Sequence, residues 1–523
     1  MARGSRHLLG QVSLILTVIL GMAGLTAPAF ADAVSCDQDC FVLSSVSIEG
    51  VSAYPMAAFA PAYADRLASP VGEQDLVRMA DAITEHYRRD GYFLTRAVIA
   101  PGDPAAGAAR IVVYEGYIGE VVVEGTGAAA VSGILVPLEQ RSILTIAELD
   151  RRLALASDMP GVTLTNRIEP VLDDPARHRL VVTAELDRST GGVFVENRGS
   201  EAQGPWQVYG WTAGNSVLRD GDRVAVSVLT TPQDVEELTF AEASYSAPLG
   251  GHTRFKVSIS GYSTNAPPGA SAWLSGDSRA ASLSLTQTIL RRKDRSLYIT
   301  ASLDVRNVEQ TYMGGRTVDE RLAVARALVS GQVTGARGWI SGWAAVSRGL
   351  DAFGATTEAR PGQTRADATG EFTKIAVGGS AYHDISRHVG VYASASAQWS
   401  DDPLLGSEEF YFGGSEVGRA FAYGERNGDK GIAGVVELRV GWDPSPSQVR
   451  FVQVYGFVDG GRVWNASPGG DVAAELASAG VGTRITLQGQ TMLRAELARP
   501  ISGRALDDQD GGWRAFVSLS KSF

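Results

Sequence analysis

Side chains that carry most metal and redox chemistry are scarce in this sequence. The 523 residues include six histidines and two cysteines, and the histidines are scattered without the spacing of a metal site. Cys36 and Cys40 lie close together, and further metal ligands are absent nearby. If the chain is exported, a disulfide between them is favoured over a metal site, and we expect neither a metal nor another cofactor.

Long apolar runs are also missing, except at the start of the chain. After Asp32, no stretch approaches the ~18 uninterrupted apolar residues that a membrane-spanning helix needs. If the protein resides in a membrane, it must therefore cross as a closed β-barrel. The formal net charge of −11 argues against binding nucleic acid and against electrostatic docking on anionic lipid.

Residues 1–31 have the features of a secretory signal peptide. Two arginines precede an apolar stretch from Leu8 to Leu25, and Ala29-Phe30-Ala31 matches the small-residue rule for cleavage. The alternative is an uncleaved N-terminal anchor, which we disfavour because the cleavage motif directly follows the apolar run. We expect the mature chain to begin near Asp32, with residues 32–40 as a short segment containing the cysteine pair.

Residues 41–116 and 117–187 show two copies of one small α+β pattern. In the first copy, apolar residues recur at helical spacing from Leu76 to Tyr87, and this second of two helical stretches stops at Gly91. In the second copy, a helix opens with the capping box Thr145-Ile146-Ala147-Glu148. Strands are expected at 41–50, 95–100 and 109–115, and again at 118–125, 162–169 and 179–186. The repeat predicts a tandem arm of β-α-α-β-β units.

From residue 188 to the C-terminus, apolar residues alternate with polar ones, as at Phe255, Val257 and Ile259. A barrel strand between lipid and a polar lumen has this period of two, but so has a soluble β-sandwich. The connections distinguish the two, because sixteen strands can be assigned and long connections alternate with short turns. The long ones include 265–277, 350–366 and 402–431. This asymmetry predicts a 16-stranded antiparallel transmembrane barrel over residues 188–523, with its short turns in the periplasm.

Several stretches resemble the TpsB family, the hemolysin secretion/activation type of transporter in two-partner secretion. They are Tyr87 through Tyr92, Val195 through Ser200 and Asn215 through Arg223, and the resemblance covers nearly the whole mature chain. It implies two periplasmic POTRA domains followed by a barrel in the lipid bilayer of the outer membrane. The terminal Phe523 resembles the signal read by the barrel-assembly machinery, which implies that machinery and periplasmic chaperones as partners during biogenesis.

The most specific part of the resemblance is the long connection after the eleventh strand. It contains Gly413 and Gly414, then Arg419-Ala420-Phe421, then Gly428-Asp429-Lys430-Gly431. The family's sixth loop folds into the lumen and carries an Arg-Gly-aromatic triplet at its tip. Ala420 departs from the usual glycine, which puts in doubt the tightest backbone contact at the tip. A second motif, Phe457-Val458-Asp459-Gly460-Gly461, resembles the strand whose aspartate pairs with the loop arginine.

Physical chemistry supports that pairing. An arginine inside a narrow lumen loses much of its hydration and needs a carboxylate, and its planar fork suits one held on a rigid strand. We therefore predict a lumen lock of Arg419, Phe421 and Asp459. The alternative is a glycine-rich surface loop with an exposed arginine, which the second motif disfavours. Because residues 32–40 would reach only about 14 Å as a helix, we expect the sixth loop alone to block the lumen.

The resemblance implies a transporter that recognises an unfolded, large TpsA-like exported partner and passes it through the barrel to the cell surface. POTRA domains bind extended chains at an exposed strand edge. We expect such edges at Thr95 to Ala100 and at Val162 to Glu169; alternatively, both are only core strands. The candidate edge residues are Thr95, Arg96, Ala97, Val98, Ile99, Thr163, Leu164 and Thr165.

Two other classes of function are weighed against this one. An assembly factor that inserts outer-membrane barrels would share the loop and the barrel, but that branch usually has more POTRA domains. An outer-membrane enzyme would need a nucleophile with a histidine near the rim, and His383 and His388 flank a turn without an evident Ser/Asp constellation. We therefore expect no enzymatic activity.

Overall fold

The computed structural model describes residues 40–199, 204–265, 274–312, 315–444, 448–465, 472–504 and 511–523. The predicted signal peptide lies outside these ranges. Cys40 is disulfide-bonded, but Cys36, the other cysteine of the chain, lies outside the described residues, so the pairing itself stays a prediction. Among the described residues, no helix is long and apolar enough to cross a lipid bilayer.

The first module is built on a three-stranded sheet in the order β2-β5-β4. Strand β2 (Ser45–Glu49) runs parallel to β5 (Ala108–Tyr114), and β4 (Arg96–Asp103) forms the other edge. Helix α1 (Glu73–Arg89) buries its apolar stripe, because Met79, Ile83 and Tyr87 recur at helical spacing and are each at most 2% exposed.

The first helical stretch of this module is not an α-helix. It consists of two 3-10 helices, η1 (Met56–Ala62) and η2 (Ala64–Arg66). Pro61 lies inside η1 and lacks the N–H that a continuing α-helix requires, so tight turns replace the regular ladder. The remaining elements are β1 (Phe41–Val42), β3 (Pro70–Val71) and η3 (Pro104–Ala106), of which β1 and β3 pair with each other.

The second module repeats the plan with a sheet in the order β6-β8-β7. Its elements are β6 (Tyr117–Glu124), α2 (Ala128–Leu135), η4 (Val136–Leu138), α3 (Ile146–Ser157), β7 (Val162–Val171) and β8 (Asp174–Leu186). The Thr145 hydroxyl accepts the Glu148 N–H at 3.3 Å, as the capping box predicts. The Glu148 carboxylate binds Arg152 at 2.7 Å, so the reciprocal half of the box is replaced by an ion pair one helical turn further on.

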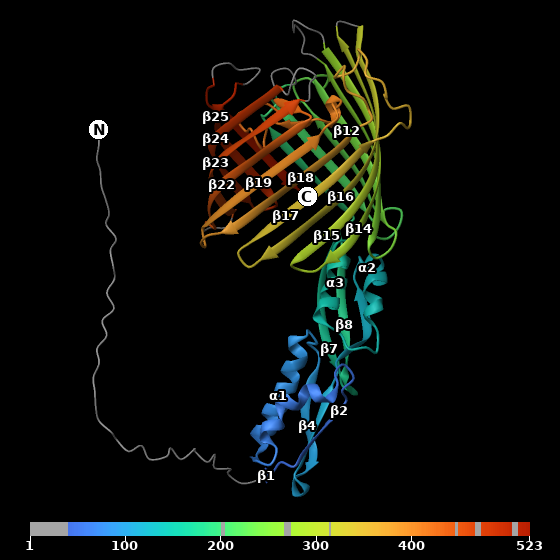
Figure 1. Ribbon diagram of the computed structural model, residues 1–523, viewed down its shortest axis with the longest axis vertical. Coiled ribbons are helices and arrows are strands. Elements are labelled where there is room, and N and C mark those ends of the chain that lie inside the picture. The colour runs from blue at the N-terminus through green and yellow to red at the C-terminus, as the bar shows by residue number, and fades with distance from the viewer. Residues whose placement is uncertain are drawn as a thin grey trace, which may run out of the picture. The chain divides into compact units, whose positions relative to one another are not determined.

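Sixteen antiparallel strands close into one barrel, which confirms the predicted fold (Figure 1). The chain order is kept around the wall, and the last strand pairs with the first. The strands are β9 (Ser189–Glu196), β10 (Gln207–Asn215), β11 (Arg223–Thr230), β12 (Leu238–Pro248), β13 (Thr253–Asn265), β14 (Leu274–Arg291), β15 (Arg295–Tyr312), β16 (Gly315–Gly335), β17 (Gly338–Gly349), β18 (Thr373–Asp384), β19 (Val389–Ser400), β22 (Lys430–Trp442), β23 (Val449–Asn465), β24 (Val472–Leu487), β25 (Thr491–Ser502) and β26 (Arg514–Ser522).

The predicted alternation assigns the two faces of the wall. Val257 and Ile259 of β13 are exposed apolar side chains on the outer face, whereas the alternate residues Lys256 and Ser258 face the lumen. Two connections at the same end of the barrel are long: loop 5, residues 350–372 between β17 and β18, and loop 6, residues 401–429 between β19 and β22.

Candidate functional site

Loop 6 is a structured segment with its own short hairpin. Strands β20 (Phe410–Phe412) and β21 (Arg426–Gly428) pair, and η5 (Gly406–Glu408) precedes them. At the turn that follows β20, Gly413 has φ 118°, and a Cβ there would lie 2.4 Å from the carbonyl oxygen of Ala422. Gly414 has φ 112° and lies against the Tyr423 ring. Only glycine fits both the backbone conformation and the space, which gives these two motif residues a structural reason.

The tip of loop 6 is packed into an apolar cluster inside the barrel. Phe421 is 2% exposed, and Ala420 is fully buried. Ala420 does not have a positive φ, so an alanine can replace the usual glycine of the triplet without backbone strain. The buried cluster consists of Phe412, Ala420, Phe421, Ala433, Val435, Tyr455, Phe457, Val463, Leu476, Ala498 and Phe516. These side chains come from loop 6 and from five strands, so burial of apolar surface seats the tip in the lumen.

Arg419 extends from this tip into a group of carboxylates. Its side chain is 4% exposed, and its Nη1 lies 2.6 Å from Oε1 of Glu437 and 3.4 Å from Oε2 of Glu496. Its Nε lies 3.7 Å from Oδ2 of Asp459. The guanidinium also stacks over the Phe457 ring, with 4.5 Å from Cζ to the ring centroid. The guanidinium thus has its shortest ion pair with Glu437, a residue that the sequence analysis did not single out.

Asp459 contacts the loop backbone more closely than the arginine fork. Its carboxylate accepts the backbone N–H of Arg419 at 3.2 Å and a hydrogen bond from the Ser478 hydroxyl. Ser478 also accepts the backbone N–H of Ala420 at 3.3 Å. Arg419 and Asp459 are therefore close, as predicted. The Asp459 carboxylate, however, binds the main chain of loop 6 more closely than it binds the Arg419 guanidinium.

Glu437 and Glu496 are the centres of a larger buried network. Glu437 pairs with Arg439 at 2.6 Å and Arg484 at 3.1 Å, in addition to Arg419. Glu496 pairs with Arg494 at 2.5 Å, accepts the Tyr455 hydroxyl at 2.7 Å and pairs with Arg198.

A sequence signal for these residues exists. Glu437 and Arg439 are charged residues at alternate positions of β22, on the face that the alternation assigns to the lumen. Only the strand register reveals that they lie opposite the loop, since Glu437 pairs with Phe457 of the motif strand.

Asp429 joins loop 6 to loop 5. Its carboxylate is fully buried, lies 2.5 Å from Arg365 of loop 5 and accepts the Leu404 N–H at 2.7 Å. Next to it, a Cβ on Gly428 would lie 2.9 Å from the Trp464 carbonyl oxygen, and one on Gly431 would lie 2.2 Å from the Phe410 ring. The Gly-Asp-Lys-Gly motif is thus the place where the base of loop 6 meets both the wall and a second loop.

Loop 5 contacts both the barrel wall and loop 6, so loop 6 is not the only loop packed at this end of the barrel; that loop 6 alone blocks the lumen stays a prediction. Thr364 of loop 5 binds the carboxylate of Glu320 on β16 and accepts the Gly406 N–H of loop 6 at 2.8 Å. An apolar cluster forms where the two loops meet this wall, with Leu322, Val324, Ala368, Phe372, Leu404 and Leu405 as its buried members. Loop residues have no period, so this contact between the two loops left no trace in the sequence pattern.

The structure places both candidate binding strands at sheet edges. β4 is an edge strand of the first sheet and β7 of the second. On β7, Thr163 and Thr165 are exposed, while Leu164 packs against the module's core.

Two of the candidate residues at β4 are not available to an added strand. Thr95 precedes the strand, and its side chain is 2% exposed. The Ala97 N–H already donates to the Thr84 hydroxyl of α1 at 2.9 Å. Thr95 and Ala97 are therefore removed from the candidate edge, which keeps Arg96, Val98 and Ile99.

Comparison with known proteins agrees with this architecture. The family model described as haemolysin secretion/activation protein ShlB/FhaC/HecB matches residues 180–485, and the ShlB-type POTRA domain matches residues 41–116. Outer membrane transporter CdiB of Dickeya dadantii is 24% identical over 417 residues, which are 77% of this chain and 73% of that protein. The heme/hemopexin transporter protein HuxB of Haemophilus influenzae is 24% identical over 193 residues, 36% of this chain and 34% of that one.

Solved structures share the fold. CdiB from Escherichia coli has a TM-score of 0.74 at 22% identity, covering 94% of this chain and 92% of that chain. BamA from Haemophilus ducreyi lacking POTRA domains 1-3 has a TM-score of 0.53 at 13% identity, covering 92% and 100%. The match of the family model decides the assignment, since it covers more than half of the chain. The chain belongs to the haemolysin secretion/activation family ShlB/FhaC/HecB, and is thus an outer-membrane β-barrel transporter of two-partner secretion with N-terminal POTRA domains, not an enzyme.

Proposed function

We propose that this chain recognises an unfolded exported partner in the periplasm through its POTRA domains and translocates it through the barrel to the cell surface. The observation that carries the proposal is the way in which the tip of loop 6 is seated inside the barrel. Its tip is held by side-chain contacts to one part of the wall, through Arg419 and the Phe421 cluster. A plug of this kind can leave its seat while the strand ladder that closes the barrel stays intact.

The edges of β4 and β7 are suited to capture an extended chain. An extended ligand adds to an exposed edge through backbone hydrogen bonds, which demand little of its sequence. Along β4 the N–H groups alternate between the neighbouring strand and the open edge. Because the Ala97 N–H points away from the sheet to Thr84, we infer that the next outward N–H belongs to Ile99, whereas that of Val98 points toward β5.

Folding of the partner outside the cell is the proposed driving force. A folded protein gains roughly 0.05 to 0.15 kcal/mol per residue relative to the unfolded chain. For a large partner this sum makes return through the barrel improbable. The sequence has no glycine loop of the phosphate-binding type, and the periplasm supplies no nucleotide, so nucleotide hydrolysis is not invoked.

Secretion of the candidate partner tests the proposal directly. The chain is expressed in an Escherichia coli outer membrane together with the large exported protein encoded in the adjacent reading frame. We expect that protein at the cell surface or in the medium only when the chain is present. As an internal control, Thr364→Cys with Gly406→Cys places a disulfide between loops 5 and 6, since a Cβ on residue 406 would lie 3.1 Å from Cβ of Thr364. Secretion that persists without the chain, or with the loops oxidised to this disulfide, contradicts the proposal.

Capture by the arm is tested separately. Ile99→Pro removes the outward N–H of β4, and Ile99→Ala keeps it while shortening the side chain to a comparable degree. We expect Ile99→Pro in the full-length protein to weaken binding of the unfolded N-terminal part of the partner about fivefold, the effect of one hydrogen bond, and Ile99→Ala to change it little. Equal binding of folded and unfolded partner would remove strand addition from the mechanism.

A further inference from the structure

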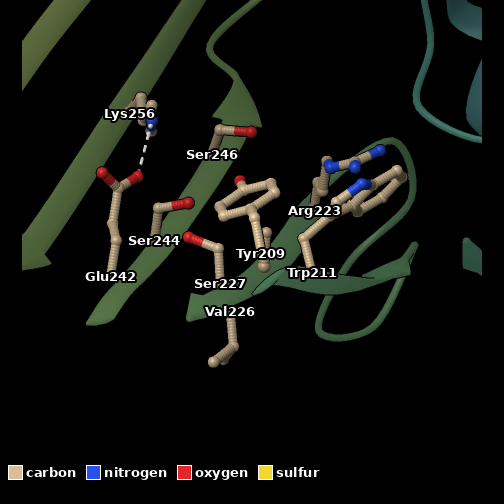
Figure 2. Close-up of a pocket in the computed structure, with 10 residues that line it drawn as sticks. Tyr209, Trp211, Arg223, Val226, Ser227, Glu242, Ser244, Ser246 and Lys256 are labelled. Atoms are coloured by element: carbon tan, nitrogen blue, oxygen red, sulfur yellow. Dashed lines mark hydrogen bonds and ion pairs between the residues drawn. The ribbon is translucent and has the colours of Figure 1, made fainter. Parts of the chain in front are cut away.

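A recess lined by polar and aromatic side chains lies on the lumen face of β10–β13. It has a volume of about 420 Å³. Its side chains come from β10, β11, β12 and β13. Figure 2 shows them projecting to one side of the wall, while Val226 points to the opposite face. The polar and aromatic residues that line it are Tyr209, Trp211, Arg223, Ser227, Glu242, Ser244, Ser246 and Lys256.

The strand register explains why these residues share one face. Trp211 pairs with Ser227, and Ser227 pairs with Glu242 on the next strand. Four residues along β11, nearer the turns, Arg223 pairs with Ser246, which pairs with Lys256. Since side chains alternate between the two faces of a strand, every second residue along each strand joins the recess.

The recess presents hydrogen-bonding groups that the protein leaves to solvent. Among the described residues, the hydroxyls of Ser227, Ser244 and Ser246 form no hydrogen bond with another side chain or backbone group. On one side Glu242 pairs with Lys256 at 3.2 Å, with both side chains partly exposed. On the other side the Arg223 guanidinium stacks over the Trp211 ring, 5.6 Å from its centroid. The site thus offers free donors and acceptors beside an aromatic platform.

The position of the recess is at the end of the lumen where the second module joins the barrel. Asn215, at the end of β10, is 1% exposed and donates its side-chain amide to the carbonyl of Asp187 in the connection before β9. Arg223 donates to the Asn215 side-chain oxygen at 3.4 Å. Gly192 of β9 leaves the space for the Trp211 ring, because a Cβ there would lie 2.7 Å from its Nε1. The recess is therefore built into the periplasmic end of the wall.

We propose that this recess is the first binding site inside the barrel for the partner in transit, and that it takes an extended polypeptide segment. This inference rests on the proposed function. An extended chain carries unpaired backbone N–H and C=O groups, which the serine hydroxyls can satisfy, and its aromatic or aliphatic side chains can stack on Trp211. The contacts through the serine hydroxyls are neutral and open to water, so each binds weakly, as a site must that passes its ligand onward.

Site-specific photocrosslinking in cells that secrete the partner tests the location. A photoreactive amino acid is placed at Ser244 in the recess, at Ala243 on the outer face of the same strand, and at Ser394 on the lumen face of β19. We expect partner adducts at Ser244 and none at Ala243. Adducts at Ser394 without adducts at Ser244 overturn the site but leave translocation standing. Adducts at neither lumen position during active secretion contradict the proposed function as well.

Filling the recess gives a second, independent measurement. Ser244→Trp occupies the space between Ser227 and Ser246, whereas Ala243→Trp adds the same ring on the lipid side. We expect Ser244→Trp to lower the rate of partner secretion about tenfold and Ala243→Trp to leave it unchanged. Both variants should retain the heat-dependent electrophoretic shift of a folded barrel. Equal secretion by the two variants shows that the partner takes another path along the wall.

Discussion

Two parts of the lumen wall differ in whether their charged side chains are buried or hydrated. The lock wall, strands β22–β25, holds Glu437, Asp459 and Glu496 with their side chains fully buried beneath loop 6. The hydroxyl wall, strands β10–β13, presents serines and a single ion pair, Glu242 with Lys256, whose side chains are 31% and 47% exposed. The lock wall binds loop 6 of the same chain, and the hydroxyl wall remains exposed to solvent.

The difference shows how one barrel can be closed and still conduct a polypeptide. A buried ion pair costs desolvation when it forms, and losing one partner leaves an uncompensated charge. Loop 6 is therefore held in one position by ion pairs whose loss would leave a buried charge without a partner. Exposed pairs contribute little to stability, so the hydroxyl wall can exchange water for a passing chain at small cost. Closure and transit are assigned to different strands.

The strongest way to break this contrast is to neutralise Glu437. Glu437→Gln leaves Arg419, Arg439 and Arg484 without their shared carboxylate, and a broken buried pair costs ~3 to 5 kcal/mol. We expect loop 6 to leave its seat, so that the open fraction in planar-bilayer recordings rises by about a hundredfold or more. Glu437→Asp keeps the charge and should restore part of the closure. If Glu437→Gln folds to a heat-modifiable barrel with unchanged conductance, the lock wall does not hold the plug.

A double-mutant cycle sharpens which carboxylate acts on the arginine side chain. Arg419→Ala removes the guanidinium but keeps the backbone N–H that Asp459 accepts. We therefore expect a coupling energy of ~2 to 3 kcal/mol between Arg419→Ala and Glu437→Gln, and less than ~1 kcal/mol between Arg419→Ala and Asp459→Asn. The open fraction is measured for every single and double variant. A larger coupling with Asp459 would restore the simple two-residue lock that the motifs suggest.

These residues also mark how far the sequence can be read. The sixteen strands follow from a period of two and from the alternation of short and long connections, and the structure confirms them. The inward course of loop 6 entered through a resemblance of motifs. Glu437 and Arg365 could not be found in this way, because their roles depend on the strand register and on a loop without periodicity. The 3-10 helices at Met56–Arg66 were not predicted as such, because the proline that prevents a regular α-helix lies inside an otherwise helical stretch.

Arg365 tests whether loop 5 contributes to the same closure. Arg365→Ala removes the partner of the buried Asp429, although Asp429 keeps the Leu404 N–H. With Arg365 15% exposed, we expect a cost of ~1 to 2 kcal/mol and an increase in the open fraction of about tenfold, below that of Glu437→Gln. Arg348→Ala is the matched control, because this arginine of β17 is exposed and binds the Thr373 hydroxyl at 2.6 Å. Equal recordings for the two variants would show that loop 5 covers the wall without helping to hold loop 6.

The smallest effect is expected on the hydroxyl wall. Glu242→Gln removes an ion pair of the same chemical type as those on the lock wall, at 3.2 Å from Lys256. Because both side chains are hydrated, the pair contributes less than ~1 kcal/mol and is screened further by salt. We expect the open fraction and the thermal unfolding temperature to match the unmodified protein, both at low salt and at about 1 M salt, where the Debye length is roughly 3 Å. If Glu242→Gln opened the barrel as Glu437→Gln is expected to do, charge on either wall would hold loop 6. Burial beneath loop 6 would then not be what distinguishes the lock wall from the hydroxyl wall.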